Sequence, residues 1–101
     1  YYKNKNFMNK QLTQIRIKLD KIDLKILKLI KSRQLLVNQV IKTKKSKNKI
    51  IDKKRIRQIL IKIKKNSKRI GVNTLVAEKI WKQMINAFIA YEYKYFKKYR
   101  K

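Results

Sequence analysis

The sequence predicts an all-α fold in which each chain has one long N-terminal helix, one short helix and one medium helix, and two chains form an intertwined homodimer. The first observation behind this is that proline is absent and glycine occurs once in 101 residues, which favours long helices over turn-rich β structure. The second is that apolar residues recur at helical spacing in three separate segments. The third is that 44% of the residues are hydrophobic, which is enough for a core despite a formal charge of +26.

The long helix is expected over residues 9–43, with an apolar seam in steps of three and four residues. The seam consists of Leu12, Ile15, Leu19, Ile22, Ile26, Leu29, Leu36 and Val40. Between Leu29 and Leu36 the same spacing reaches Arg33, whose guanidinium stays charged at any ordinary pH. Because burying an unpaired guanidinium costs several kcal/mol, we expect Arg33 either to extend out of the seam or to bind an anion there.

A polar loop over residues 45–51 is expected to separate the long helix from the second. Asp52 has the residue type and position of an N-cap, and the second helix is expected to continue to about Arg69. Gly71 then fits the left-handed residue that commonly ends a helix. The third helix is expected over residues 75–99.

The third helix has an apolar stripe that is interrupted once. Its members are Ala77, Trp81, Met84, Ile85, Phe88, Tyr95 and Tyr99. The same spacing predicts an apolar residue at position 92, where the sequence has Glu92. Two charged residues of opposite sign, Arg33 and Glu92, therefore interrupt two apolar faces.

The unequal helix lengths predict the homodimer. At about 1.5 Å per residue the second helix is roughly half as long as the first. A single chain would leave much of the long seam facing water, whereas the long helix of a second copy would cover it.

The residue types that are absent exclude several kinds of site. Without Cys or His, the chain has no disulfide scaffold, Cys nucleophile, His general base or conventional zinc site. No apolar run approaches the ~18 residues of a membrane-spanning helix, and residues 1–10 lack the apolar core of a signal peptide. We therefore expect a cytoplasmic protein with no membrane association. Residues 1–8 are expected to be a flexible N-terminal extension, and residues 9–101 are expected to form a single domain.

The spacing of four cations is compatible with a site for a small anion. Arg33 and Lys44 are three turns apart on one face, about 16 Å along the axis. Arg16 lies about 25 Å before Arg33 by the same rise, so it can join only from a partner's antiparallel helix. Arg55 is one turn into the second helix, whose positive end favours anions. Spacing alone leaves other interpretations open: a seam arginine that fixes register, a solvated lysine at a helix end, and a Glu92 that pairs with a nearby cation.

The order and spacing of these residues resemble the all-helical, AroQ-type chorismate mutase family over nearly the whole chain. The positions with the resemblance are Arg16, the segment Leu19-Asp20-Lys21-Ile22-Asp23, Arg33, Lys44, Asp52 and Arg55. The tail over residues 88–96 is more similar to the isochorismate pyruvate lyase branch of that family.

The resemblance implies an intertwined homodimer with two equivalent pockets, no metal and no cofactor, acting on a small dicarboxylate, chorismate or isochorismate. It implies that Arg33 and Arg16 of the partner chain bind the two carboxylates, for which a guanidinium is well suited. Lys44 is implied to contact a carboxylate and the ether oxygen. Arg55 is implied to add positive electrostatic potential at the site, and Asp52 is implied to recognise the ring hydroxyl.

Two residues depart from the mutase pattern. The family usually has Gln at position 92, donating a hydrogen bond to the ether oxygen. Glu92 can donate only when it is protonated, a state that burial favours and nearby cations disfavour. The mutase pattern also has Glu directly after Arg55, where this chain has Ile56. Ile56 favours the lyase branch, whereas Asp52 favours the mutase.

The expected function is that of a chorismate mutase, which converts chorismate to prephenate in aromatic amino acid biosynthesis. The alternative on the same fold is isochorismate pyruvate lyase, which yields salicylate and pyruvate. An alternative from another class is a basic helical protein that binds nucleic acid, for which tyrosines interleaved with lysines near the C-terminus could stack bases. The lysines lie on all helix faces and no nucleic-acid motif appears, so a nucleic-acid partner is not expected.

Overall fold

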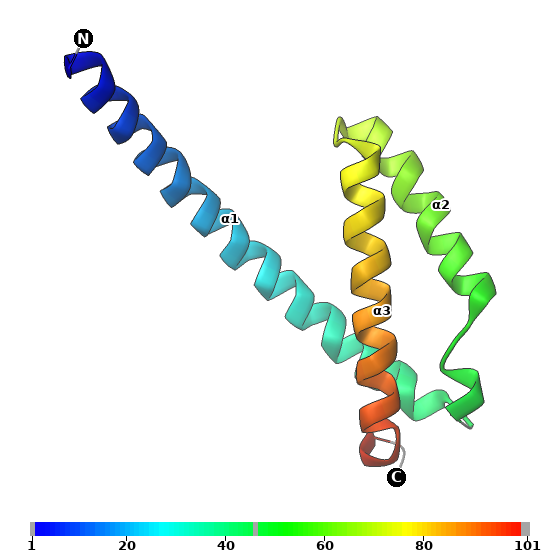
Figure 1. Cartoon of the computed structure of the whole chain (residues 1–101). Helices are drawn as coiled ribbons and strands as arrows, with labels where there is room; N and C mark the ends of the chain where they lie inside the picture. Colours follow the sequence, from blue (N-terminus) through cyan, green and yellow to red (C-terminus); the bar gives the residue numbers. More distant parts are fainter. Residues whose placement is uncertain (1, 46, 100–101) are drawn as a thin grey trace. The chain divides into compact units, whose positions relative to one another are not determined.

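Four helical segments make up the part of the chain that the computed structural model describes: the backbone of residues 2–45 and 47–99, and the side chains there except those of residues 2–6, 48 and 99. The segments are α1 (Tyr2–Thr43), the short 3-10 helix η1 (Lys47–Lys49), α2 (Lys53–Ile70) and α3 (Thr74–Tyr99) (Figure 1). No strand occurs among these residues. The predicted all-α fold with a long, a short and a medium helix is therefore confirmed.

The helix boundaries differ from the predicted ones mainly at the start of α1. This helix begins at Tyr2, seven residues before the predicted start at residue 9. No proline or glycine occurs in that segment to end the helix. In the predicted loop over residues 45–51, η1 adds one short turn, in which the backbone N–H of Ile50 donates to the carbonyl oxygen of Lys47 at 3.1 Å.

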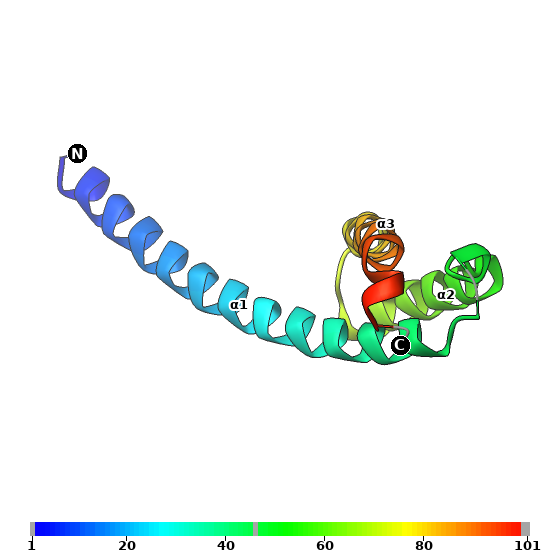
Figure 2. The same ribbon diagram turned by 90° about the horizontal axis from the view of Figure 1, so that it is seen from below.

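The chain comprises two compact units, residues 1–35 and residues 36–101. The first unit is the N-terminal part of α1, drawn in blue to cyan in Figure 2. Its seam residues, from Leu12 to Leu29, are between 44% and 70% exposed. The seam that the sequence predicts is thus a solvent-facing apolar surface in the single chain.

The second unit consists of the last turns of α1 with η1, α2 and α3. Asp52 caps α2 as predicted, since its Oδ1 accepts a hydrogen bond from the backbone N–H of Arg55 at 3.0 Å. At the other end Gly71 adopts the left-handed conformation with φ 92°, and its N–H donates to the carbonyl oxygen of Ser67 at 2.9 Å. Asn73 then caps α3 by accepting from the N–H of Val76 at 3.1 Å.

The interior of the second unit has two parts. Helix α2 packs along α3 (Figure 1) and its half-buried apolar residues are Ile56, Ile59, Leu60 and Ile63. Farther along, Ile41, Ile50 and Phe96 form a buried cluster with Val37, Ile89 and Tyr91 packed against it. This cluster joins the end of α1 and the segment after η1 to the C-terminal half of α3, where the candidate site residues of this unit are found.

Candidate functional site

Burial along the second half of α1 defines where Arg33 lies on the helix. Seam residues Leu29 and Leu36 are 70% and 60% exposed. The residues that are at least partly buried follow a neighbouring face and are Ile30, Arg33, Val37, Asn38 and Ile41. Because successive residues turn by about 100°, Arg33 lies at the border between the exposed seam and the more buried face. The guanidinium-bearing side chain of Arg33 is thus partly shielded from water in the single chain.

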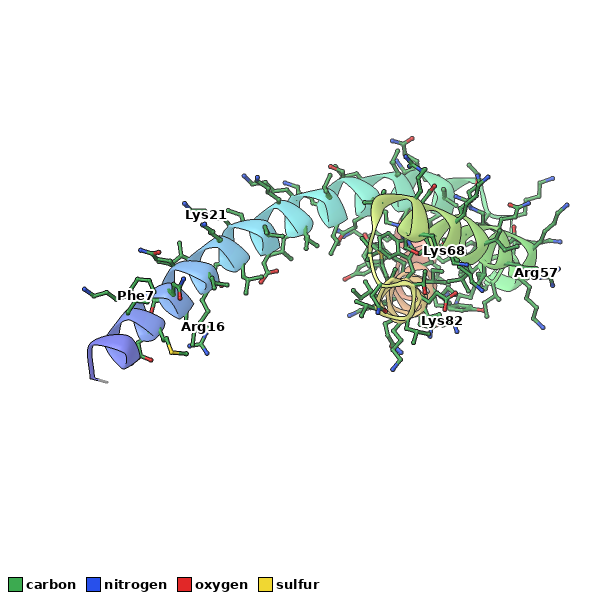
Figure 3. All side chains as sticks on the ribbon, turned by 90° about the horizontal axis from the view of Figure 1, so that it is seen from above. Phe7, Arg16, Lys21, Arg57, Lys68 and Lys82 are labelled. Carbon is green, nitrogen blue, oxygen red and sulfur yellow. The ribbon has the colours of Figure 1, made fainter. Side chains whose placement is uncertain are left out.

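Arg16 lies in the first unit and is exposed (Figure 3). It is seventeen residues before Arg33 on the same continuous helix. The axial rise keeps the two guanidiniums on different turns, about 25 Å apart by backbone position. The expectation that Arg16 acts from a partner chain stays a prediction.

In the second unit, Lys44 and Asp52 line one open hollow of about 510 Å³, together with Lys49, Ile51 and Lys53. Lys44 follows the last residue of α1, and its backbone N–H donates to the carbonyl oxygen of Ile41 at 3.1 Å. Three of the five lining residues are lysines and one is an aspartate, so the net charge of the lining favours an anionic ligand. The structure thus brings together two of the predicted site residues.

Asp52 also has a structural role as the N-cap of α2. Its Oδ1 already accepts the N–H of Arg55 as the cap of α2. This bond fixes the carboxylate at the edge of the hollow and makes its position depend on the start of the helix. Arg55 is exposed in the first turn of α2 and lies outside the lining of the hollow.

Glu92 is 9% exposed, so position 92 faces inward as the stripe of α3 predicts. It lies among three aromatic residues on the same face of α3. The Phe88 and Tyr91 rings meet edge to face with centroids 6.2 Å apart, and the Tyr91 and Tyr95 centroids are 4.7 Å apart. The carboxyl group is therefore attached to a helix face that is largely shielded from water. Glu92 does not belong to the lining of the hollow.

Two features of this region were missed from the sequence. Lys49 and Lys53 line the hollow beside Lys44, but in a chain this rich in lysine their residue type gives no signal. The other is a hydrogen bond in which the hydroxyl of Tyr91 donates to Oδ1 of Asn38 at 2.6 Å. The two partners are 53 positions apart in the sequence, so no local pattern indicates the pair.

No cluster of three or more His, Cys, Asp or Glu in the described part of the chain is arranged to hold a metal ion. Of the helices described, none is both long enough and apolar enough to cross a bilayer.

A family model described as chorismate mutase type II matches residues 15–93. That range includes all six candidate residues, namely Arg16, Arg33, Lys44, Asp52, Arg55 and Glu92. No curated protein and no solved structure gives a significant match to the chain.

Proposed function

The chain belongs to the chorismate mutase type II family, and from that premise we propose that it converts chorismate to prephenate by an intramolecular rearrangement. The observation that supports this most is the match over residues 15–93, which contains every candidate site residue. Such a pericyclic step needs no nucleophile, so the lack of His and Cys is no obstacle. The protein has to hold the substrate in a folded conformation and stabilise charge on the ether oxygen as the C–O bond breaks.

The two substrate carboxylates are bound by arginines. We assign one to Arg33 and the other to Arg16 of the partner subunit. A guanidinium offers two parallel N–H donors to a carboxylate and keeps its charge at all working pH values. The partial burial of Arg33 strengthens such a pair by excluding water from one side. A homodimer is a requirement of this arrangement, because one helix cannot deliver both arginines to one ligand.

The ether oxygen is the centre of the reaction, and Lys44 and Glu92 are assigned to it. Lys44, which lines the hollow of the second unit, donates through its ammonium group. Glu92 donates as the neutral acid. Asp52, at the rim of the same hollow, recognises the ring hydroxyl, and Arg55 adds positive potential at the start of α2.

The substrate assignment is tested by incubating the purified protein with chorismate and with isochorismate in parallel. We expect prephenate from chorismate, and loss of that product in Arg33→Ala. Salicylate and pyruvate from isochorismate would move the assignment to the lyase branch, which Ile56 and the aromatic segment over residues 88–96 favour. Turnover of neither substrate would contradict both activities and leave binding of a polyanion as the leading alternative.

The assignment of Glu92 predicts that activity rises as the pH falls. Only the protonated carboxyl can donate to the ether oxygen, and its population grows with decreasing pH. The Glu92 side chain is 9% exposed, and the pH profile reports which protonation state of its carboxyl group is the active one. The measurement is kcat/KM for chorismate between about pH 5 and pH 8.

Glu92→Gln is the matched variant, because an amide donates at every pH and has nearly the same shape. We expect it to flatten the profile and to retain activity at the alkaline end. A flat profile in the unaltered protein would exclude Glu92 as the donor to the ether oxygen.

A further inference from the structure

Tyr91 and Asn38 connect the two chain segments that hold the candidate catalytic residues of the second unit. The Tyr91 hydroxyl donates to Asn38 Oδ1 at 2.6 Å, and both side chains are partly buried. Asn38 lies on α1 six residues before Lys44, and Tyr91 directly precedes Glu92 on α3. This side-chain hydrogen bond therefore joins the segment of Lys44 to the segment of Glu92.

The tyrosine end of this hydrogen bond is held by packing. The Tyr91 ring contacts the rings of Phe88 and Tyr95, with centroids 6.2 Å and 4.7 Å away. It also packs against the buried cluster that includes Ile41, three residues after Asn38. The Tyr91 ring therefore has little freedom to swing away, and its hydrogen bond to Asn38 restrains the end of α1 relative to α3.

The bond supplies a directional restraint that the cluster lacks. Apolar contacts are non-directional and tolerate small sliding and rotation of one helix against another. A hydroxyl-to-amide bond weakens steeply when its angle or distance changes, and 2.6 Å is at the short end of the range for O–H···O contacts. The restraint acts one residue from Glu92 and, through the helical turn ending at Thr43, on Lys44.

We propose that Tyr91, held by Asn38, is a positioning residue. It keeps Lys44 and Glu92 placed so that both can donate a hydrogen bond to the same acceptor atom of the ligand. This inference rests on the proposed function for the roles of those two residues. Two donors that converge on one ether oxygen have to be correctly placed together, and a displacement of about 1 Å can reduce the rate about 10²-fold. Tyr91 acts through the position of these donors and does not itself touch the reacting atoms.

Three variants test the proposal by kinetics. Tyr91→Phe removes only the hydroxyl, Asn38→Ala removes the acceptor, and Asn38→Asp keeps an acceptor of the same size. We expect the first two each to lower kcat about 10-fold with KM changed less than about twofold, and the double variant to lose no more than either one. Asn38→Asp is expected to stay within about twofold of the unaltered protein. Tyr93→Phe, which removes a hydroxyl from a 39% exposed ring on α3, is the control and should change neither constant.

Hydrogen exchange provides a readout that needs no substrate. The Lys44 amide donates to the carbonyl oxygen of Ile41 at 3.1 Å, so its exchange rate reports the order of the turn after Asn38. We expect faster exchange of that amide in Tyr91→Phe and an unchanged rate in Tyr93→Phe.

The outcomes separate this inference from the proposed function. An unaltered protein that turns over chorismate, with kcat and Lys44 exchange both unchanged in Tyr91→Phe, would overturn the positioning role alone. Failure of Asn38→Asp to restore kcat would also overturn it. Absence of turnover in the unaltered protein would overturn the proposed function. The placement of Lys44 relative to Glu92 would then have no role in catalysis, even if Lys44 exchange responds to Tyr91→Phe.

Discussion

Mixing Arg16→Ala chains with Arg33→Ala chains is expected to restore about a quarter of the unaltered activity, although each variant alone is nearly inactive. In the proposed dimer each pocket takes Arg33 from one chain and Arg16 from the other. Random exchange makes half of the dimers mixed, and each mixed dimer has one intact pocket and one that lacks both arginines. The measurement is the rate of chorismate consumption after subunit exchange, for example after joint refolding of the two variants.

The effect is large because each single variant leaves a substrate carboxylate without its cation. We expect a loss of about 10³-fold in kcat/KM, equivalent to about 4 kcal/mol of transition-state stabilisation. Lys31→Ala removes one positive charge from an exposed site on α1 and is the matched control, with an expected change below about twofold. If Arg16 instead served the pocket of its own chain, no pocket in the mixed dimer would be intact and mixing would restore nothing.

Replacing Ile22 with Glu is expected to separate the dimer into single chains and abolish activity. Ile22 is 50% exposed in the single chain, so the substitution would have little effect on a protein that worked alone. Once a partner covers the seam, however, each copy buries a charge at about 3 kcal/mol. The two symmetry-related sites together raise the dimer dissociation constant by about 10⁴-fold.

Leu24→Glu is the control for this variant. Leu24 is 53% exposed and lies on the far side of α1 from Ile22, since two residues turn the helix by about 200°. Sedimentation equilibrium and chorismate turnover, measured on both variants, are expected to distinguish them. If both substitutions dissociate the dimer equally, the interface is not confined to one face of α1. If the Ile22→Glu protein remains dimeric and active, the seam is not the dimer interface.

The fold was largely predictable from local pattern. The seam of α1, the cap at Asp52 and the left-handed Gly71 are all features of short sequence windows, and the structure has each of them. The first seven helical residues of α1 were not predicted because a polar segment without proline or glycine has no signal for either helix or extension. The turn of η1 was missed for the same reason, since its residues Lys47–Lys49 have no periodicity.

A site residue was predictable where its type departs from the pattern of its neighbours in the sequence. Glu92 stands out because the stripe around it is apolar, and it is indeed buried. Lys49 could not stand out among 31 basic residues. The contact between Tyr91 and Asn38 depends on tertiary packing across 53 residues, and no spacing rule within one helix indicates it.

The exposed apolar side chains of the N-terminal half of α1 also affect how the protein responds to dilution. A helix whose apolar side chains are mostly exposed gains little from folding by itself, because most helical stability comes from packing. In the proposed dimer, that packing is supplied by the other subunit, so the unfolding midpoint depends on subunit concentration by mass action. Newly made chains at low abundance would then be the ones most open to proteolysis, and an increase in expression would raise specific activity per chain as well as the number of chains.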